Sequence, residues 1–408
     1  MIPVSVIVVS RGRPGPLGLC LTGLGQLCYD NYELVVVADP AGSETVSALG
    51  LAHRIKSVAF DLANISAARN AGIAAAAGAV LAFIDDDAVP EPSWLARLVA
   101  PFADGDVAAT GGYVIGRDGI RLQYGARAVN ALGETVESTA AAQTPFTPAL
   151  PAGFRVKTEG TNMAVRREVL AGLGGFDPAY RFYLDETDLD LRLAAAGARV
   201  VLAPGALVHH AVAASDRRGA DRAPRDLTEI GASAAVFARK HEPGTAPEAV
   251  LARLVAGQRR LLIGHMVAGR LEPGDVGRLL DGLAAGFRAG WAREIVPLGP
   301  IGGPEAGFLP FESRATGASR HIAGRVWSRR RLRAQAAEAL ARGETVTLFR
   351  LSPTALRHRV RFHPGGWWEH SGGVFGRSAR GDPAFRLTSF RARVAREWAR
   401  VAAQRQCR

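Results

Sequence analysis

Short, continuous apolar runs alternate with helix-forming segments through the first 87 residues of the chain. Three such runs are rich in Val, Ile and Leu, at residues 4–10, 33–39 and 79–84, and the segment 56–60 is expected to be a further strand. Runs of this kind are typical of parallel strands that are buried on both faces. The segments expected to be helical are residues 19–27, 44–50 and 65–78, with a loop at 11–18 and a turn at 40–43. This alternation predicts a mostly parallel sheet flanked by helices, with ligands at the carboxyl ends of its strands.

The pattern becomes less regular after residue 90. The expected elements are a helix at 92–102, a strand at 108–115, loops with short strands over 116–157, a strand turning into a helix at 161–176, a helix at 184–197 and a strand after it. Residues 226–297 have a helical pattern, and the Gly- and Pro-rich stretch 298–310 is expected to be a linker. We therefore divide the chain into an α/β domain at 1–225, a helical extension at 226–297 and a small α+β accessory domain at 311–408.

Composition narrows the class of protein. Of the 408 residues, 48% are hydrophobic and 22% are charged, which is typical of a globular protein with a sizeable core. No apolar run reaches the roughly 18 residues that a membrane span needs, and the N-terminus resembles a first strand rather than a signal peptide. Cys20, Cys28 and Cys407 suggest neither a disulfide framework nor a zinc site. These features favour a cytoplasmic protein.

The positive charge of the chain is concentrated at one end. Residues 301–408 hold 21 Arg, no Lys and 7 acidic residues, a balance of +14, whereas the overall charge is +12. Four of the six tryptophans lie in the same part. Arginine interleaved with aromatic residues suits an anionic membrane surface, where the protein would be peripheral at the inner face. A small packed domain with solvated arginines is the alternative, and nucleic acid is disfavoured.

Three consecutive carboxylates follow the fourth apolar run. Asp85, Asp86 and Asp87 would repel one another at the end of a buried strand unless a cation balances them. Divalent ions such as Mn²⁺ and Mg²⁺ take oxygen ligands and often bridge carboxylates to a diphosphate. A solvated acidic turn that caps the next helix is the alternative for this motif.

A second acidic cluster begins the helix expected at 184–197. Its members are Asp185, Glu186, Asp188 and Asp190. Acidic residues in a first helical turn also favour the helix dipole, and Asp188 can pair with Arg192 one turn later, so a purely structural role is open. A helix start can equally hold a carboxylate rigidly as a general base. His209 and His210, after a strand, are either metal ligands or structural. The glycine fingerprints of dinucleotide and ATP sites are absent from the sequence.

The order of these motifs resembles glycosyltransferase family 2. The blocks that carry the resemblance are SVIVVSRGRP, VVVADPAG, AARNAGIAAAAG with FIDDDAVPEPSWL, EGTNMAVRREVLAGLGGFDPAYRFYLDETDLDLRL, and PGALVHH, within residues 3–215. The resemblance implies a GT-A fold, a Rossmann-type sheet that binds a nucleotide-diphospho-sugar. It also implies inverting, metal-dependent transfer to a saccharide or lipid-linked acceptor, with Mn²⁺ or Mg²⁺ as cofactor and a UDP-sugar as the favoured donor, in surface polysaccharide assembly.

The resemblance also assigns roles to residues. The implied nucleotide-sugar-binding residues are Ser10, Arg13, Asp39 at the base, Arg69, Asp85 at the ribose, Asp86, and Gly160, Thr161 and Asn162 on the sugar or acceptor side. The implied metal ligands are Asp87, Asp85 and His210, with His209 as the alternative to His210. Glu186 takes the place of the catalytic base, but the acidic pair is in swapped order, so Asp185 remains the alternative. Pro40 replaces a second Asp that many members have.

Two other functions compete with this interpretation. One is a nucleotidyltransferase of sugar phosphates, which needs a basic glycine-rich loop that SRGRPGPLG only partly supplies. The other is a non-catalytic nucleotide-sugar-binding module. Because both acidic clusters are present, the sequence favours a catalytic site over an inactive one.

Overall fold

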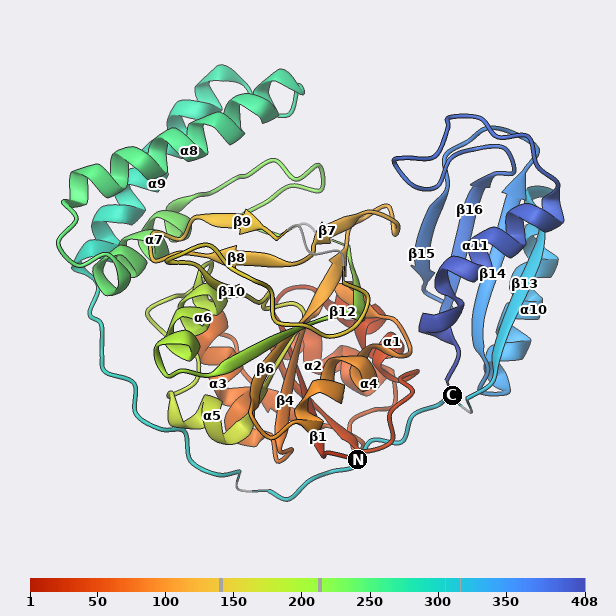
Figure 1. Cartoon of the computed structure of the whole chain (residues 1–408), viewed down its shortest axis with the longest axis horizontal. Helices are drawn as coiled ribbons and strands as arrows, with labels where there is room; N and C mark the ends of the chain where they lie inside the picture. Colours follow the sequence, from red (N-terminus) through yellow and green to blue (C-terminus); the bar gives the residue numbers. More distant parts are fainter. Residues whose placement is uncertain (139–141, 212–214, 305, 316, 408) are drawn as a thin grey trace.

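The first half of the chain forms a large twisted sheet with helices on both faces (Figure 1). The computed structural model describes residues 1–138, 142–211, 215–304, 306–315 and 317–407; parts of the expected loop region 116–157 and of the expected accessory domain lie outside them. The βα units are β1 (Val4–Ser10), α1 (Pro14–Leu24), β2 (Tyr32–Ala38), α2 (Pro40–Ala48), β3 (Lys56–Ala59), α3 (Ile65–Ala75) and β4 (Val80–Asp85). β3, β2, β1 and β4 are neighbours in this order and pair in parallel, as the apolar pattern predicted.

Two helices begin earlier than predicted, each at a proline. The segments around Pro14 and Pro40 were predicted as a loop and a turn, but α1 and α2 start at these residues. Proline suits the first helical turn because its missing N–H has no partner there in any helix. Asp39 caps α2 by accepting a hydrogen bond from the Gly42 N–H at 2.9 Å.

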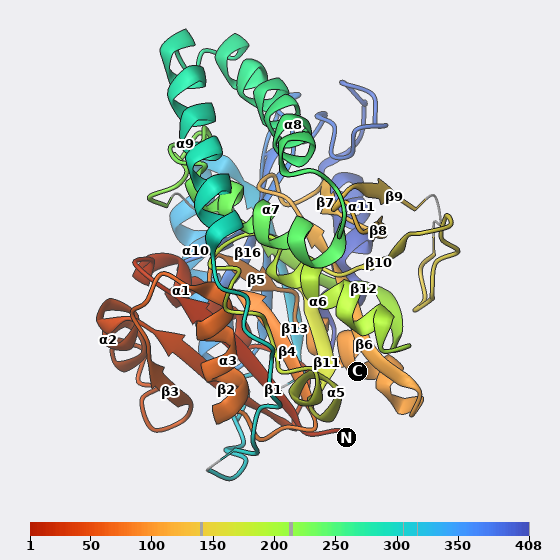
Figure 2. The same cartoon turned by 90° about the vertical axis from the view of Figure 1, so that its left-hand side faces the viewer.

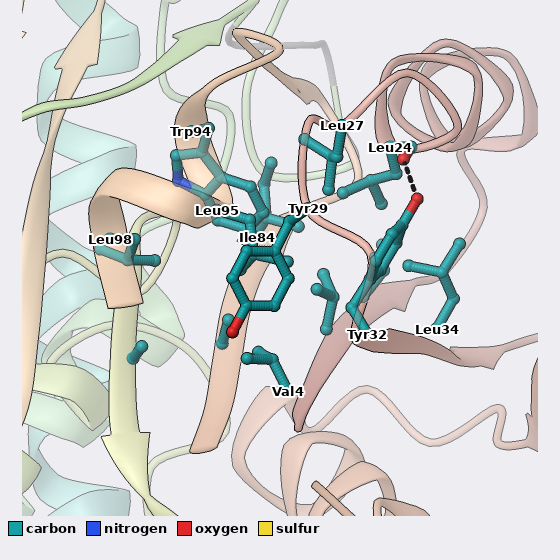
Figure 3. Packing of buried hydrophobic residues seen from close by; sticks show 14 of the residues in the cluster. Val4, Leu24, Leu27, Tyr29, Tyr32, Leu34, Ile84, Trp94, Leu95 and Leu98 are labelled. Atoms are coloured by element: carbon teal, nitrogen blue, oxygen red, sulfur yellow. Dashed lines mark hydrogen bonds between the residues drawn. The ribbon is translucent and has the colours of Figure 1, made fainter. Parts of the chain in front are cut away.

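The second half of the sheet is mixed. Its elements are β5 (Ala88–Pro90), α4 (Trp94–Val99), β6 (Val107–Ile115), β7 (Leu122–Tyr124), β11 (Met163–Arg166), α5 (Arg167–Gly172), α6 (Asp185–Ala195) and β12 (Arg199–His210). β11 lies antiparallel between β4 and β6, β12 is parallel to β6, and β5 is antiparallel to β12. Apolar clusters cover both faces of the sheet. Figure 3 shows one of them, where the Tyr32 hydroxyl donates to the Leu24 carbonyl at 2.9 Å.

Three helices and a small sheet cover the strand ends. The sheet consists of β10 (Arg155–Lys157), β8 (Arg127–Val129) and β9 (Thr135–Glu137). The helices are α7 (Thr228–His241), α8 (Pro247–Val267) and α9 (Pro273–Ala292). α8 and α9 form a hairpin that projects beyond the sheet (Figures 1 and 2).

An extended strap connects α9 to the C-terminal domain and runs along the surface of the α/β domain (Figure 1). Hydrogen bonds join Ile301 N to Ala171 O at 3.0 Å and Phe311 N to Tyr32 O at 2.7 Å. The predicted linker is therefore held against the domain on which it lies.

The C-terminal domain has a four-stranded sheet with two helices. Its elements are β13 (Ser319–Arg325), α10 (Arg329–Ala341), β14 (Thr345–Ser352), β15 (Arg359–His363), β16 (Trp367–Gly373) and α11 (Phe390–Arg405), which confirms the α+β prediction. The strand order is β13-β14-β16-β15. The end of α11 lies against β5, where buried Arg405 forms an ion pair with buried Glu91 at 2.8 Å.

One sequence prediction is wrong here. Cys28 and Cys407 form a disulfide, with their Cα atoms 5.4 Å apart. The two residues are 379 positions apart, so their spacing gave no sign of the pairing. Only the docking of α11 brings them together. None of the helices in the described ranges is both long and apolar enough to cross a membrane.

Candidate active site

The carboxyl ends of β1, β2 and β4 bring three polar positions together. Ser10 ends β1, Asp39 follows β2, and Asp85 ends β4, which pairs with β1 through Val9. Asp39 accepts hydrogen bonds from the Gly12 N–H at 2.8 Å and from the Gly42 N–H. Both of its oxygens therefore fix the loops after β1 and β2, and its predicted contact with a nucleotide base remains a prediction.

The end of β1 and the loop after it hold the side chain of Asp86 in place. Its side chain is completely buried, the Ser10 hydroxyl donates to it at 2.7 Å, and the Arg13 guanidinium forms an ion pair with it. Burial raises the pKa of Asp86 to about 7, although the Arg13 charge opposes the shift. Arg13 also reaches Asp87 Oδ2 at 3.3 Å. Ser10 and Arg13 thus lie beside the acidic motif, and their predicted contact with a nucleotide-sugar remains a prediction.

Asp85, Asp87 and His210 form a cluster that can hold a metal ion. One ligand atom from each lies within 4.8 Å of the others, and His210 Nε2 is 3.2 Å from Asp87 Oδ1. Burial lowers the pKa of His210, but the hydrogen bond to Asp87 and the charges of Asp87 and Asp85 together outweigh this effect and raise it overall. Two carboxylates and an imidazole suit Mn²⁺ or another divalent ion of similar preference.

The two neighbouring histidines of β12 point to different surroundings. Side chains alternate along a strand, so His209 faces away from His210. His209 Nε2 lies 2.8 Å from Glu91 Oε1, and its ring packs against Trp368 with centroids 4.4 Å apart. His209 is therefore part of the contact with the C-terminal domain, and the structure places His210 beside the acidic motif.

Arg69 connects the two acidic clusters. It lies on α3, is buried, and forms ion pairs with Asp185 and, at 3.4 Å, with Asp85. It also donates to the Gly160 carbonyl at 3.1 Å. A Cβ atom at position 160 would lie 2.6 Å from Arg69 Nη2, so a larger residue there would force the guanidinium to shift. The sequence motifs at positions 69, 85, 160 and 185 therefore meet in one place.

The two acids at the start of α6 have different environments. Asp185 is buried against Arg69, whereas the side chain of Glu186 retains 19% exposure and pairs with Lys157 Nζ at 3.0 Å. Burial raises the pKa of Asp185 despite the Arg69 charge. Burial alone would also raise the pKa of Glu186, but the Lys157 ammonium reverses the effect and lowers it. Glu186 is thus ionised and partly accessible.

The turn before α6 has a strained backbone. Tyr183 and Leu184 have φ angles of 74° and 66°, in the left-handed region that costs about 1–3 kcal/mol for residues with a side chain. Such strain persists only where the surroundings impose it. It sets the direction in which the first turn of α6 presents Asp185 and Glu186.

Two other predicted residues, Asp188 and Asn162, are engaged in structural contacts, whereas the buried Thr161 hydroxyl has no hydrogen-bond partner among the described residues. Asp188 pairs with Arg192 at 2.7 Å, as the helix spacing suggested, and also with Lys240 at 2.6 Å. The Asn162 side chain is fully buried and accepts from Trp94 Nε1 at 2.8 Å, and Thr161 is buried beside it. The predicted contacts of Asn162 and Thr161 with a sugar or acceptor remain predictions.

Lys157 was missed by the sequence analysis. It is one of three lysines in a chain with 50 basic residues, and it ends β10 immediately before the Thr-Glu-Gly-Thr-Asn segment. The rarity of lysine in this chain was the feature of the sequence that could have pointed to Lys157. Its partner Glu186 lies 29 residues away, so the contact itself could not be read from spacing.

A mostly parallel α/β sheet with acidic residues at its carboxyl edge is the arrangement of nucleotide-binding enzymes. The chain belongs to a particular group of them: residues 3–225 match the family described as "Glycosyltransferase like family 2". The family match and the observed sheet agree with the GT-A-like fold expected from the sequence motifs.

Among characterised relatives, the chain is 31% identical over 241 residues to the O-antigen biosynthesis protein RfbC of Myxococcus xanthus, covering 54% of this chain and 18% of that protein. It is 29% identical over 246 residues to the pre-mycofactocin glycosyltransferase of Mycobacterium tuberculosis, covering 56% of this chain and 50% of the relative. The chain thus spans half or less of the length of these relatives. A solved structure of the mannosyltransferase PcManGT from Pyrobaculum calidifontis, in complex with GDP-Man and Mn²⁺, is 19% identical, with a TM-score of 0.43 over 72% of this chain and 88% of that one.

Proposed function

We propose that the chain is an inverting, metal-dependent glycosyltransferase that moves a sugar from a nucleotide-diphospho-sugar to a saccharide or lipid-linked acceptor. The observation that carries this proposal is the position of Arg69 between Asp85 and Asp185. It joins the acidic edge suited to a metal and a diphosphate to the helix start suited to a general base. A donor and an acceptor would thereby be held on either side of one buried guanidinium.

Different residues of the site are proposed to have different roles in the reaction. Asp85, Asp87 and His210 would hold the divalent ion, whose chemistry is to neutralise charge on the departing diphosphate. Glu186 is the proposed base, because it is ionised and partly exposed. It would accept the proton of the acceptor hydroxyl as that oxygen attacks the anomeric carbon from the face opposite the leaving group. A single displacement of this kind inverts the configuration.

Asp185 is less suited to be the base. Its side chain is 4% exposed and already engaged with Arg69. We assign it a positioning role: it holds Arg69 against Asp85 and the Gly160 carbonyl. The swapped order of the acidic pair in the sequence therefore leaves the second acid in the catalytic role.

The name of the Myxococcus xanthus relative, an O-antigen biosynthesis protein, supports a role in surface polysaccharide assembly. A UDP-sugar is the proposed donor. The test is incubation with Mn²⁺ and a panel of UDP-, GDP- and TDP-sugars, followed by measurement of nucleoside diphosphate release and of the anomeric configuration of the product. Metal-dependent release from one donor with an inverted product supports the proposal, and a retained configuration contradicts it.

A peripheral contact with anionic membranes is a second part of the proposal. The C-terminal domain presents Trp327 with 70% exposure beside the exposed residues Arg329, Arg330 and Arg331 at the start of α10. An exposed tryptophan among arginines suits the headgroup region of a membrane, and each basic residue near an anionic surface contributes about 1 kcal/mol.

Vesicle co-sedimentation tests this contact. The full chain is expected to bind phosphatidylserine-containing vesicles at low salt and to release them at high salt. Arg330→Gln/Arg331→Gln should weaken binding, whereas Arg155→Gln/Arg288→Gln removes two exposed charges elsewhere and should not. Equal binding by both double variants would refute the assignment to α10.

A further inference from the structure

The ammonium group of Lys157 lies where β10 meets α6 (Figures 1 and 2). Lys157 is the last residue of β10, and its side chain is 6% exposed. Its Nζ atom donates to Glu186 Oε1 at 3.0 Å, to Thr187 Oγ1 at 2.9 Å and to the Thr158 carbonyl at 3.4 Å. An ammonium has three N–H donors, so each of them has a partner here and the side chain is held in one orientation.

The residue after Lys157 binds the same helix. Thr158 donates to Asp190 twice, from its backbone N–H at 2.9 Å and from its hydroxyl at 2.7 Å. Asp190 lies one helical turn after Glu186 on α6. Two consecutive residues of this segment are therefore bound to two successive turns of α6, which keeps Lys157 next to Glu186.

The other acids near Glu186 oppose its ionisation. Asp185 precedes it, Asp190 follows it by one turn, and Glu159 comes two residues after Lys157. After burial, the charge of Glu186 contributes to the raised pKa values of Asp185, Glu159 and Asp190, so all three lie within its electrostatic reach. Carboxylates this close to one another tend to hold a proton unless a cation offsets their repulsion.

Two cations lower the pKa of Glu186 against the effect of its burial, and the charge of Lys157 contributes more than that of Arg69. Arg69 is in contact with Asp185. Arg127, on β8, donates to Glu159 at 3.0 Å. Among the residues that the structure describes, Lys157 is thus the basic residue that forms an ion pair with Glu186.

The remaining titratable groups around the start of α6 do not replace this cation. Burial raises the pKa of Tyr183, so its phenol is neutral. On α7, Lys240 and His241 pair with Asp188 at 2.6 and 2.9 Å. The ionisation of Glu186 therefore depends chiefly on Lys157.

We propose that Lys157 is a positioning residue of sugar transfer, whose ammonium keeps the Glu186 carboxylate ionised and in one orientation for the acceptor hydroxyl. The inference rests on the proposed function, because that proposal gives Glu186 its role as the base. It adds a second residue to the same step, one that touches the base rather than the substrate. Without this ammonium, Glu186 would take up a proton at neutral pH and could not accept one from the acceptor.

A matched pair of variants separates this role from a purely structural one. Lys157→Met removes the charge and keeps an unbranched side chain of similar length. Lys240→Met is the control, because Lys240 also pairs with an acid of α6, and that acid, Asp188, retains its ion pair with Arg192.

The first measurement is the rate of nucleoside diphosphate release between pH 5.5 and 9, at saturating Mn²⁺, from the sugar nucleotide of the donor panel that the full chain uses. The ratio of the native rate to the Lys157→Met rate should rise by about tenfold for each pH unit on the acid side, where Glu186 is protonated in the variant. The ratio for Lys240→Met should stay constant. A ratio that does not change with pH for Lys157→Met, or that changes equally for both variants, overturns the inference.

The second measurement needs no substrate. In Lys157→Met, burial and the neighbouring acids should raise the folded-state pKa of Glu186 above its unfolded value of about 4.3. The unpaired carboxylate then destabilises the fold fully at pH 8, and less as the pH falls toward 5. The decrease in the urea midpoint that Lys157→Met causes should therefore be smaller at pH 5 than at pH 8. In a Glu186→Gln background this decrease should vary much less with pH, and equal variation in both backgrounds contradicts the inference.

Lys157→Gln keeps a hydrogen-bond donor without the charge, and it replaces Lys157→Met in both measurements if that variant does not fold. The inference and the proposed function fail separately. Release of nucleoside diphosphate with a constant rate ratio refutes the role of Lys157 alone. Absence of release from every donor by the native chain refutes the proposed function, whereas the urea midpoints still show whether Lys157 controls the ionisation of Glu186.

Discussion

The two neighbouring acids at the start of α6 have different partners, because Asp185 pairs with Arg69 and Glu186 pairs with Lys157. Asp185 is buried in its ion pair with Arg69. Glu186 pairs with Lys157 and keeps part of its side chain exposed. The two neighbouring carboxylates therefore differ in accessibility and in the direction in which their pKa values shift. A difference of this kind is how paired acids acquire separate roles.

The variant Glu186→Gln tests the role of the base. The amide keeps the shape of the side chain but cannot accept the proton, so kcat should fall by about 10²–10⁴-fold. The donor KM should change little, because Glu186 is proposed to act on the acceptor and forms its ion pair with Lys157, outside the Asp85–Asp87–His210 cluster. Asp185→Asn is the comparison: it should perturb donor binding as well, through Arg69. Full activity of Glu186→Gln with an inactive Asp185→Asn would make Asp185 the base.

For individual residues, the sequence predicted which side chains lie near one another but not which groups they contact. The place of Asp85 and Asp87 followed from the end of an apolar run, whereas Arg69 and His210 were expected near them only from the resemblance to the family. Lys157 and the exact partners of Arg69 did not, because contacts across 29 to 116 residues depend on tertiary packing.

At the scale of elements, the pairing of β5 with β12 links the metal cluster to the C-terminal helix. β5 pairs with the end of β12, where His210 lies opposite Ala88. Glu91, just after β5, is bound on one side by His209 of β12 and on the other by Arg405 of α11. Arg405 is also stacked over Trp368, 4.5 Å from its ring centroid. The C-terminal domain thus supports the strand that carries His210.

Loss of the Arg405 charge should destabilise the protein strongly. Arg405→Met leaves Glu91 buried without its cation, which typically costs about 3–5 kcal/mol in the free energy of unfolding. Adding Glu91→Gln should restore part of that loss in a double-mutant cycle monitored by chemical denaturation. Arg400→Met, on the same helix, removes a partly exposed charge that pairs with Asp382 at 3.3 Å and with Glu397 at 3.7 Å. Because Glu397 keeps Arg393 and Arg396, the loss should be no more than about 1 kcal/mol. Equal effects of the two single variants would contradict the account.

The same pair predicts acid sensitivity. Burial would raise the pKa of Glu91, but Arg405 outweighs it and lowers the pKa to about 2. Because the folded-state pKa lies below the unfolded value of about 4.3, the stabilisation is complete above that pH and is lost as the pH falls toward 2. Protonation of Glu91 should therefore remove about 3 kcal/mol from the free energy of unfolding. Unfolding of the native chain between pH 5 and 2.5 should therefore show a steeper pH dependence than that of Glu91→Gln/Arg405→Met; equal slopes would contradict the assignment.

Element types were predicted well where the apolar pattern was long, and element starts less well. The strands β1, β2 and β4 follow from continuous apolar runs, and their parallel direction follows from the alternation of strands and helices. The starts of α1 and α2 were missed because Pro14 and Pro40 were interpreted as breakers, although each occupies a first helical turn.

At the scale of the whole molecule, the C-terminal domain is integrated with the α/β domain. A strap follows the surface, α11 places Arg405 next to β5, and the Cys28–Cys407 disulfide joins the loop between α1 and β2 to the segment after α11. The sequence predicted a separate basic unit from its charge and its Gly- and Pro-rich boundary. Charge and Gly and Pro content describe only the composition of the segment. The surfaces through which the two domains contact each other produce no local pattern in either sequence.

The central claim is that the edge formed by Asp85, Asp87 and His210 binds a nucleoside diphosphate through a divalent ion. The most direct measurement is the thermal unfolding midpoint with UDP and Mn²⁺, with each alone, and with UDP in EDTA. At a ligand concentration of 100 Kd, binding to the native state stabilises it by about 2.7 kcal/mol. We predict that UDP raises the midpoint only with the metal, that Asp87→Ala abolishes this gain, and that Asp281→Asn, on α9, keeps it. An equal gain in EDTA, or one that survives Asp87→Ala, would contradict the account.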